Sequence, residues 1–85
     1  MKAQSILPTA EIAFLAKLEA LERKNLLAIP RTWDEFSDIL GLSYVMYYKH
    51  VKSLHKKNII IHEKLFNEHT IVNRIHILKR LENIL

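Results

Sequence analysis

The only glycine of the chain, Gly41, lies between two stretches in which apolar residues recur at helical spacing. It restricts the fold more than any other position. Glycine adopts without penalty the left-handed conformation that follows the last residue of many helices, so we expect a helix to end at Leu40. Ser43 is a suitable N-cap for the next helix, predicted from Tyr44 to about Lys57. The sequence therefore predicts two helices joined by a tight turn.

Two more helices are expected on the N-terminal side of this turn. Thr32 and Glu35 have the spacing of a capping box, so the second helix should begin directly after Thr32. A first helix is predicted over residues 10–24, with Thr9 as its N-cap and Asn25 at its end, and residues 26–31 are expected to form an extended connector. The apolar residues at helical spacing that predict the core are Phe14, Leu18, Leu21, Trp33, Phe36, Ile39, Leu40, Tyr47, Val51 and Leu54.

After Asn58 the pattern changes to runs of β-branched residues. Two such runs, separated by a polar break at 67–69, predict a β-hairpin over residues 59–77. Ile71, Ile75 and Ile77 should share one face of its second strand with Asn73, and Val72, Arg74 and His76 should lie on the other. Residues 78–85 are expected to form a short helical tail. The expected fold class is α+β, with three helices, a two-stranded hairpin and this tail.

The 85 residues suffice for one hydrophobic core, so we expect a single domain over residues 1–85 with an N-terminal arm at 1–8. Cysteine is absent, which excludes disulfides and thiolate zinc sites. No apolar run approaches the roughly 20 residues of a membrane span, and no signal peptide is visible. These features predict a cytoplasmic protein without a membrane partner.

The basic residues are concentrated in the second half of the chain. Residues 1–42 hold five Lys/Arg against six Asp/Glu, a balance of −1, whereas residues 43–85 hold eight against three, a balance of +5. From Ser43 to Ile61 there are four lysines, two histidines and no acid. Such an asymmetry favours a polyanionic partner, although a solvated helix face has the same composition.

A family resemblance rests on three motifs: Leu40-Gly41-Leu42-Ser43, then Tyr48-Lys49-His50-Val51 with Leu54, then Asn58-Ile59-Ile60. The segment from Thr32 to Ile60 resembles the winged-helix core of MarR-like, ArsR-like and PadR-like repressors of bacteria and archaea. The resemblance implies a winged helix-turn-helix, with the helix-turn-helix at 32–57 and the wing at 59–77. It also implies a small transcriptional regulator that binds double-stranded DNA. Such a regulator would come from a bacterium, an archaeon, a virus or a plasmid.

In this interpretation the third helix enters the major groove with the side opposite its buried stripe. Val45 would contact thymine methyl groups, Lys49 a guanine or a phosphate, and Lys52 and Lys56 phosphates. The expected DNA-binding residues are Ser43, Tyr44, Val45, Tyr48, Lys49, Lys52 and Lys56 on the helix, and Lys64 and Arg74 on the wing.

Some of these positions have other interpretations. Tyr44 can instead pack against the second helix, Met46 fill a gap beside the core, Trp33 anchor the core, and Lys57 interact with the C-terminal end of the third helix. The apolar run from Tyr44 to Met46 favours an alternative function, a winged-helix module that binds a partner protein and not DNA.

His55, His62, His69 and His76 recur every seven residues, but they fall on a helix, a strand, a loop and another strand, so their spacing gives no common face. Only His62 and His76 are possible neighbours, across the hairpin. Without an i, i+4 histidine pair or cysteine we expect no metal and no other cofactor. Without a phosphate loop or an activated nucleophile, we expect no catalytic residues and no enzyme activity.

Families with this core usually act as homodimers, and the resemblance carries that expectation here. Apolar residues of the first helix and of the tail exceed what a core of this size needs, so they are the expected dimer interface. These residues are Ile12, Ile77, Leu78, Leu81, Ile84 and Leu85.

Overall fold

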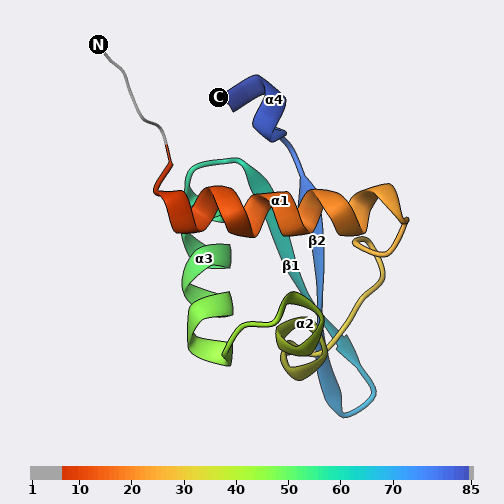
Figure 1. The fold of residues 1–85 in the computed structure, drawn as a ribbon. Helices are drawn as coiled ribbons and strands as arrows, with labels where there is room; N and C mark the ends of the chain where they lie inside the picture. Colours follow the sequence, from red (N-terminus) through yellow and green to blue (C-terminus); the bar gives the residue numbers. More distant parts are fainter. Residues whose placement is uncertain (1–6, 85) are drawn as a thin grey trace.

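The computed structural model describes residues 7–84, in which three helices precede a two-stranded antiparallel sheet and a short helix follows it (Figure 1). The elements are α1 Thr9–Arg23, α2 Trp33–Leu40, α3 Tyr44–Lys56, β1 Ile60–Asn67, β2 Thr70–Ile77 and α4 Leu81–Ile84. This confirms the predicted α+β class and the winged helix-turn-helix order. Each helix of the described part is too short or too polar to cross a bilayer.

Local signals set the ends of α2 and α3. The Thr32 side chain accepts the backbone N–H of Glu35, whose carboxylate accepts the N–H of Thr32, so the predicted capping box is present. Gly41 has φ 69° and ψ 33°, the left-handed conformation that ends α2. Ser43 accepts the N–H of Met46 at 3.3 Å and caps α3. Asn58, with φ 60°, ends the turn that follows α3.

The start of α1 differs from the prediction. Thr9 is the first helical residue and not the N-cap, a position that Pro8 takes without a side-chain bond. The Pro8 carbonyl accepts the N–H groups of Glu11 and Ile12, both at 3.0 Å, so the hydrogen-bonded turn begins one residue earlier. The fixed φ of proline suits this entry into a helix. Asn25 adopts φ 59° after the helix, as expected of a stop signal.

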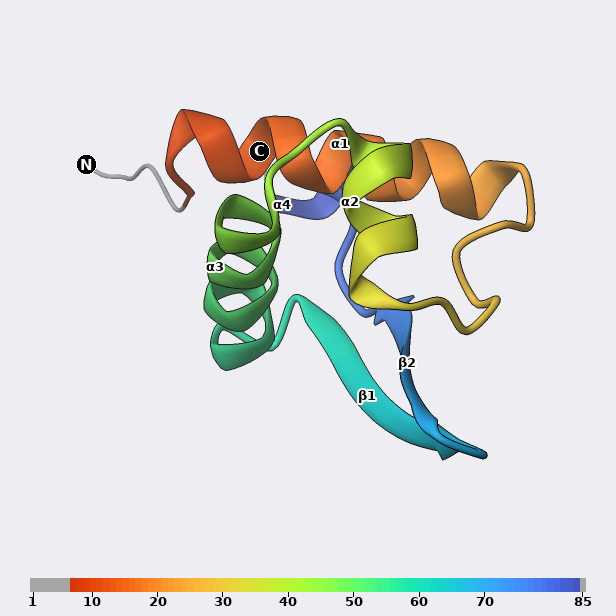
Figure 2. The same cartoon turned by 90° about the horizontal axis from the view of Figure 1, so that it is seen from below.

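The hairpin is longer than predicted in its first strand. The ladder runs from the pair of Ile60 and Ile77 to the pair of Asn67 and Thr70, so only residues 68 and 69 form the turn. Seen from below, the hairpin extends well past the helices (Figure 2). The prediction ended this strand near Lys64, because the following residues break the β-branched run. Backbone pairing with β2 extends it to the turn.

The connector 26–31 turns and is not extended along its length, which corrects the prediction. Leu27 is buried in the core, and the Arg31 guanidinium donates to the carbonyl oxygens of Leu26 and Ile29, which folds the segment back. Only Arg31 pairs with the sheet. Its N–H donates to the Asn73 carbonyl at 2.9 Å, and the Asn73 N–H donates to the Arg31 carbonyl at 2.6 Å.

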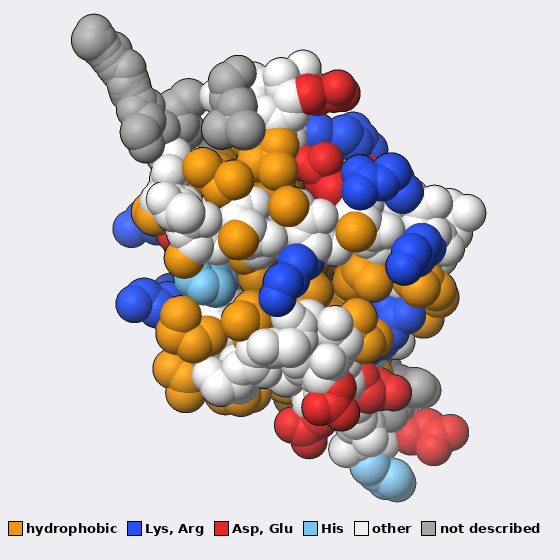
Figure 3. All heavy atoms as spheres, viewed as in Figure 1, with side chains coloured by type: hydrophobic (Ala, Val, Ile, Leu, Met, Phe, Trp, Pro, Cys, Tyr) orange, Lys and Arg blue, Asp and Glu red, His pale blue; other side chains and the backbone are white. Residues whose placement is uncertain are grey.

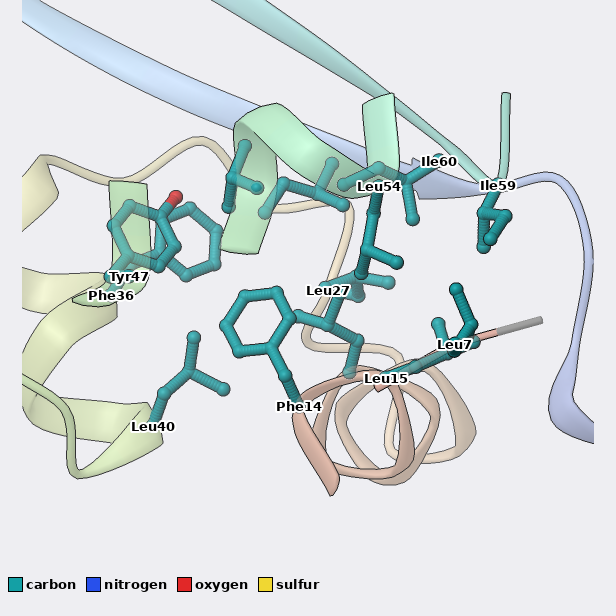
Figure 4. Packing of buried hydrophobic residues seen from close by; sticks show 13 residues of the cluster. Leu7, Phe14, Leu15, Leu27, Phe36, Leu40, Tyr47, Leu54, Ile59 and Ile60 are labelled. Atoms are coloured by element: carbon teal, nitrogen blue, oxygen red, sulfur yellow. The ribbon is translucent and has the colours of Figure 1, made fainter. Parts of the chain in front are cut away.

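The core lies where α1, α2, α3 and the base of the hairpin meet (Figure 4). Tyr47 is at its centre, with its ring stacked 5.6 Å from that of Phe36 and tilted 6.2 Å from that of Phe14. Most residues of the predicted core stripes are buried, whereas Leu21 and Trp33 pack against the core from its edge. Ile39 is exposed, which corrects the prediction for the second helix. The buried apolar residues are Leu7, Phe14, Leu15, Leu18, Leu27, Phe36, Leu40, Tyr47, Val51, Leu54, Ile59, Ile60 and Ile75.

The tail packs against α1 of the same chain. Arg80 forms a two-pronged ion pair with Glu22, at 3.0 and 2.7 Å, and the N–H of Leu81 donates to Glu19. The apolar residues expected to be surplus are therefore used within one molecule, because α4 covers the end of the core. Those packed against it are Ile12, Ile77, Leu81 and Ile84. Leu78 is exposed, and Leu85 lies outside the described residues.

Candidate nucleic-acid interface

The side of α3 that faces away from the core is positively charged. Because Tyr47, Val51 and Leu54 are buried, the helical period turns Lys49, Lys52 and Lys56 outward, and all three are exposed as predicted. α3 contains no acidic residue. Within residues 7–84, none of these three ammonium groups forms an ion pair.

Basic side chains lie on several parts of the surface, whereas the acidic ones avoid α3. In the view of Figure 3, acidic side chains gather over α2 and the wing tip. α2 alone contributes Asp34, Glu35 and Asp38. This distribution of charge would repel a polyanion at the acidic end and attract it toward α3.

Aromatic rings lie beside the lysines at the N-terminal half of α3. The rings of Tyr44 and Tyr48 stand edge-on to Trp33, with centroids 5.4 and 5.5 Å from it, and the two tyrosine rings are parallel within 3° at 6.4 Å. The His62 ring packs against Trp33 from β1 at 5.3 Å. We call Trp33, Tyr44, Tyr48 and His62 the aromatic cluster. It joins α2, α3 and the hairpin at the surface.

Two lysines lie over rings of this cluster. Lys52 Nζ is 5.9 Å from the centroid of Tyr48, and Lys64 Nζ is 5.9 Å from that of Trp33. Both distances are within the range of a cation–π interaction. The aromatic cluster and the basic side of α3 therefore form one continuous surface, to which β1 contributes Lys64.

Four positions had alternative interpretations as packing or helix-end residues, and the structure shows the contacts of each. Trp33 packs against the core, as the alternative predicted, and its ring also contacts the two exposed rings of Tyr44 and Tyr48. Tyr44 packs against Trp33 while half of it remains exposed. Met46 borders an apolar groove between α1 and α3 and is itself exposed. The Lys57 ammonium group forms an ion pair with Glu11 of α1.

The two predicted wing residues lie on opposite faces of the hairpin. Strand alternation places Lys64 on the face of Asn73, and Arg74 with Glu63 on the other. Arg74 Nε donates to Glu63 Oε1 at 2.9 Å, and this hydrogen bond is the main reason why the pKa of Glu63 is lowered. Lys64 therefore joins the basic surface of α3, whereas Arg74 already has a partner elsewhere.

His62 and His76 also lie on opposite faces, so the suggestion that they are neighbours is wrong. His62 Nε2 is 2.8 Å from Asn73 Oδ1, while His76 is 3.2 Å from Glu63. Burial lowers the pKa of His62, with smaller contributions from Lys64 and His55, against the hydrogen bond to Asn73. Among residues 7–84 no three His, Asp or Glu side chains are grouped as metal ligands.

Sequence reasoning missed the aromatic cluster as a unit. Its one visible signal was the i, i+4 spacing of Tyr44 and Tyr48, which places both rings on one side of α3. It also missed Phe66, which is 82% exposed near the wing tip.

Comparison with known proteins gives no relative. No protein-family model, curated protein or solved structure matches this chain.

Proposed function

We propose that this protein binds double-stranded DNA by placing α3 in the major groove. The observation that carries the proposal is the outward side of α3, where Lys49, Lys52 and Lys56 are exposed without an ion pair in the described chain. The 13 residues of α3 span about 20 Å, and a helix fits the roughly 12 Å wide groove of B-DNA.

The exposed side chains suggest a role for each position. Val45, 68% exposed, suits a thymine methyl group, and Lys49 suits a guanine or a phosphate. Lys52 and Lys56 suit phosphates. The hydroxyl groups of Ser43, Tyr44 and Tyr48 are further phosphate donors. On the wing, Lys64 is well placed for an adjacent phosphate, whereas Arg74 would have to share its guanidinium between Glu63 and DNA.

We further propose that the protein is a small cytoplasmic transcriptional regulator and acts as a homodimer. The outer edges of α1 and α4, next to exposed Leu78, are the proposed contact. Two-fold pairing would separate the two α3 helices by about 34 Å, one turn of DNA, and would require an inverted-repeat site. Sedimentation at increasing protein concentration measures the assembly, and a monomer at every concentration, with and without DNA, would contradict it.

Titration of a labelled random-sequence duplex at several salt concentrations tests DNA binding. Four to five phosphate contacts per subunit predict a slope of log K against log salt of about −4 for a monomer, and about twice that for a dimer. A binding constant that does not change with salt would contradict the proposal. Selection of bound duplexes from a random pool then shows whether the site is an inverted repeat.

A second candidate function is the binding of a partner protein through the same scaffold. The exposed apolar edge formed by Tyr44, Val45 and Met46 favours it, because a contiguous apolar patch often marks a protein interface. This alternative predicts no duplex binding at micromolar protein and low salt, so the same titration separates the two functions.

A further inference from the structure

Apart from Lys49, the N-terminal half of α3 offers rings where hydrogen-bonding side chains would be needed to discriminate base edges in the major groove. Ser43 Oγ accepts the N–H of Met46 as the helix cap, which leaves its hydroxyl hydrogen for a phosphate, and Val45 has no polar group. Tyr44 and Tyr48, in contrast, expose 50% and 38% of their surfaces. Large rings left this exposed on a small domain indicate a ligand with an aromatic or apolar surface of its own.

The two tyrosine rings are held in place by a third ring. Trp33 meets both edge-on, and it is itself packed against buried Tyr47 at 4.9 Å. Edge-to-face contacts of this kind favour one ring orientation. The parallel planes of Tyr44 and Tyr48 therefore form a preorganised platform, and a ligand that stacks on it loses little further side-chain entropy.

The charges around the platform select a phosphate-bearing ligand. Lys52 and Lys64 lie over rings of the aromatic cluster, and Lys49 is exposed on the adjoining side of α3. A protein partner would need a matching acidic surface. A nucleic acid strand whose bases are not paired supplies both planar rings and regularly spaced negative charges.

We propose that the aromatic cluster binds single-stranded DNA by stacking unpaired bases on Tyr44 and Tyr48, while Lys49, Lys52 and Lys64 hold the phosphates. In a duplex the faces of the bases are covered by their neighbours and cannot stack on a side chain. This activity thus goes beyond the proposed duplex binding, which uses the same lysines but only the hydroxyl groups of the two tyrosines and not the faces of their rings.

The test compares three ligands of matched length, each about 12 nucleotides: oligo(dT), an abasic strand with the same phosphates, and a duplex. Binding is followed by fluorescence anisotropy of labelled strands and by the emission of Trp33, the only tryptophan of the chain. We expect oligo(dT) to bind at least ten-fold more tightly than the abasic strand and to quench Trp33. Equal affinity for the two strands would overturn the proposal.

Substitutions then locate the platform. Tyr44→Leu combined with Tyr48→Leu removes the rings and should weaken oligo(dT) binding at least ten-fold, with little effect on the abasic strand. The matched control, Tyr44→Phe with Tyr48→Phe, keeps the rings and should retain binding. Unchanged oligo(dT) affinity in the leucine variant would overturn the assignment of the platform to Tyr44 and Tyr48. If that variant fails to fold, the comparison of oligo(dT) with the abasic strand on the parent protein decides the proposal.

The duplex arm separates this inference from the proposed function. Duplex binding without a preference for oligo(dT) over the abasic strand leaves the proposed function standing and rejects the platform. Preferential oligo(dT) binding without duplex binding rejects the proposed function and leaves the platform standing. An oligo(U) strand in the same assay shows whether the platform also accepts RNA, and stronger binding of oligo(U) than of oligo(dT) would reject DNA as the ligand.

Discussion

Lys57 Nζ lies 2.8 Å from Oε1 of Glu11, and this ion pair joins the end of α3 to the first turn of α1. The Ser53 hydroxyl donates to the other carboxylate oxygen at the same distance. Because only 11% of the Glu11 side chain is exposed, its charge depends on these two donors. One acidic residue of α1 thus fixes the helix that carries the candidate DNA-binding surface.

Replacing Glu11 by glutamine should lower the free energy of unfolding by about 1–3 kcal/mol, since a charged acceptor of two hydrogen bonds is lost. Urea denaturation measures this. Glu68→Gln, in the exposed turn of the hairpin, is the control and should change stability little. Equal stability of the two variants would show that the ion pair contributes nothing.

Acid should remove the contribution of Glu11. Burial raises the pKa of Glu11, but the hydrogen bonds from Lys57 and Ser53 and the charge of Lys57 outweigh it, so the pKa lies below the ordinary value of 4.5. The stabilisation is therefore fully present above pH 4.5 and is lost as the pH falls through the lowered pKa. In Glu11→Gln this part of the pH dependence should be absent.

Tyr47→Phe should stabilise the protein. The Tyr47 ring is fully buried, and its hydroxyl has no hydrogen-bond partner within the described chain. Burial also raises the pKa of this hydroxyl far above its usual range. Removing an unsatisfied polar atom should increase the free energy of unfolding by about 1 kcal/mol, which urea denaturation measures. A loss of stability would show that the hydroxyl has a partner.

Gly41→Ala should cost about 1–2 kcal/mol, because a side chain is unfavourable at φ 69°. A Cβ atom added there has nothing within 4 Å, so the cost comes from the backbone and not from a clash. Gly41→Asn should cost less, since asparagine tolerates this conformation. Thermal melting of the three proteins gives the order, and equal melting temperatures would contradict the backbone argument.

Lys49→Ala combined with Lys52→Ala should weaken duplex binding and reduce the salt slope by about 2, while stability stays nearly unchanged. The control removes the same charge elsewhere, at exposed Lys24 and Lys79. Both variants are titrated with the same duplex. If the control weakens binding equally while its sedimentation stays that of the parent protein, net charge and not the surface of α3 accounts for the affinity.

His62 should make the fold sensitive to mild acid. Burial is the main reason why its pKa is below 6.5, so the folded protein favours the neutral ring. Stability is then full above pH 6.5 and falls as the pH drops from 6.5 toward the lowered pKa, a range above that of Glu11.

Melting temperatures measured between about pH 5 and 7.5 test this. His62→Gln keeps a donor for Asn73 without titrating there, so its melting temperature should change less over this range. His69→Gln, in the exposed turn, is the control and should behave as the parent protein. If His62→Gln shows the full pH dependence, another group causes it.

The parts of the fold that were predictable depend on neighbours along the chain. The capping box at Thr32, the left-handed Gly41 and the cap at Ser43 each involve residues within about one helical turn. The buried stripes follow from helical periodicity. Element order and helix ends could therefore be predicted closely, apart from the single residue by which α1 starts early after Pro8.

What escaped prediction depends on tertiary contacts. Glu11 and Lys57 are 46 positions apart, and no local pattern links them. The outward side of α3 was predictable from its buried stripe. Its support by Trp33, and the pairing of Arg74 with Glu63 on the other face of the wing, required the packing of α2 on α3 and the strand register.

The bridge between Arg31 and Asn73 has a mechanical consequence. Arg31 directly precedes the residue that caps α2, and Asn73 also bonds His62 across the hairpin, so the middle of the wing is tied to α2 by backbone and side-chain bonds. We therefore expect a displacement of this part of the wing to move α2 with it. The part beyond Asn73 has no such tie to α2 in the described chain, and bending of the wing should be concentrated in it.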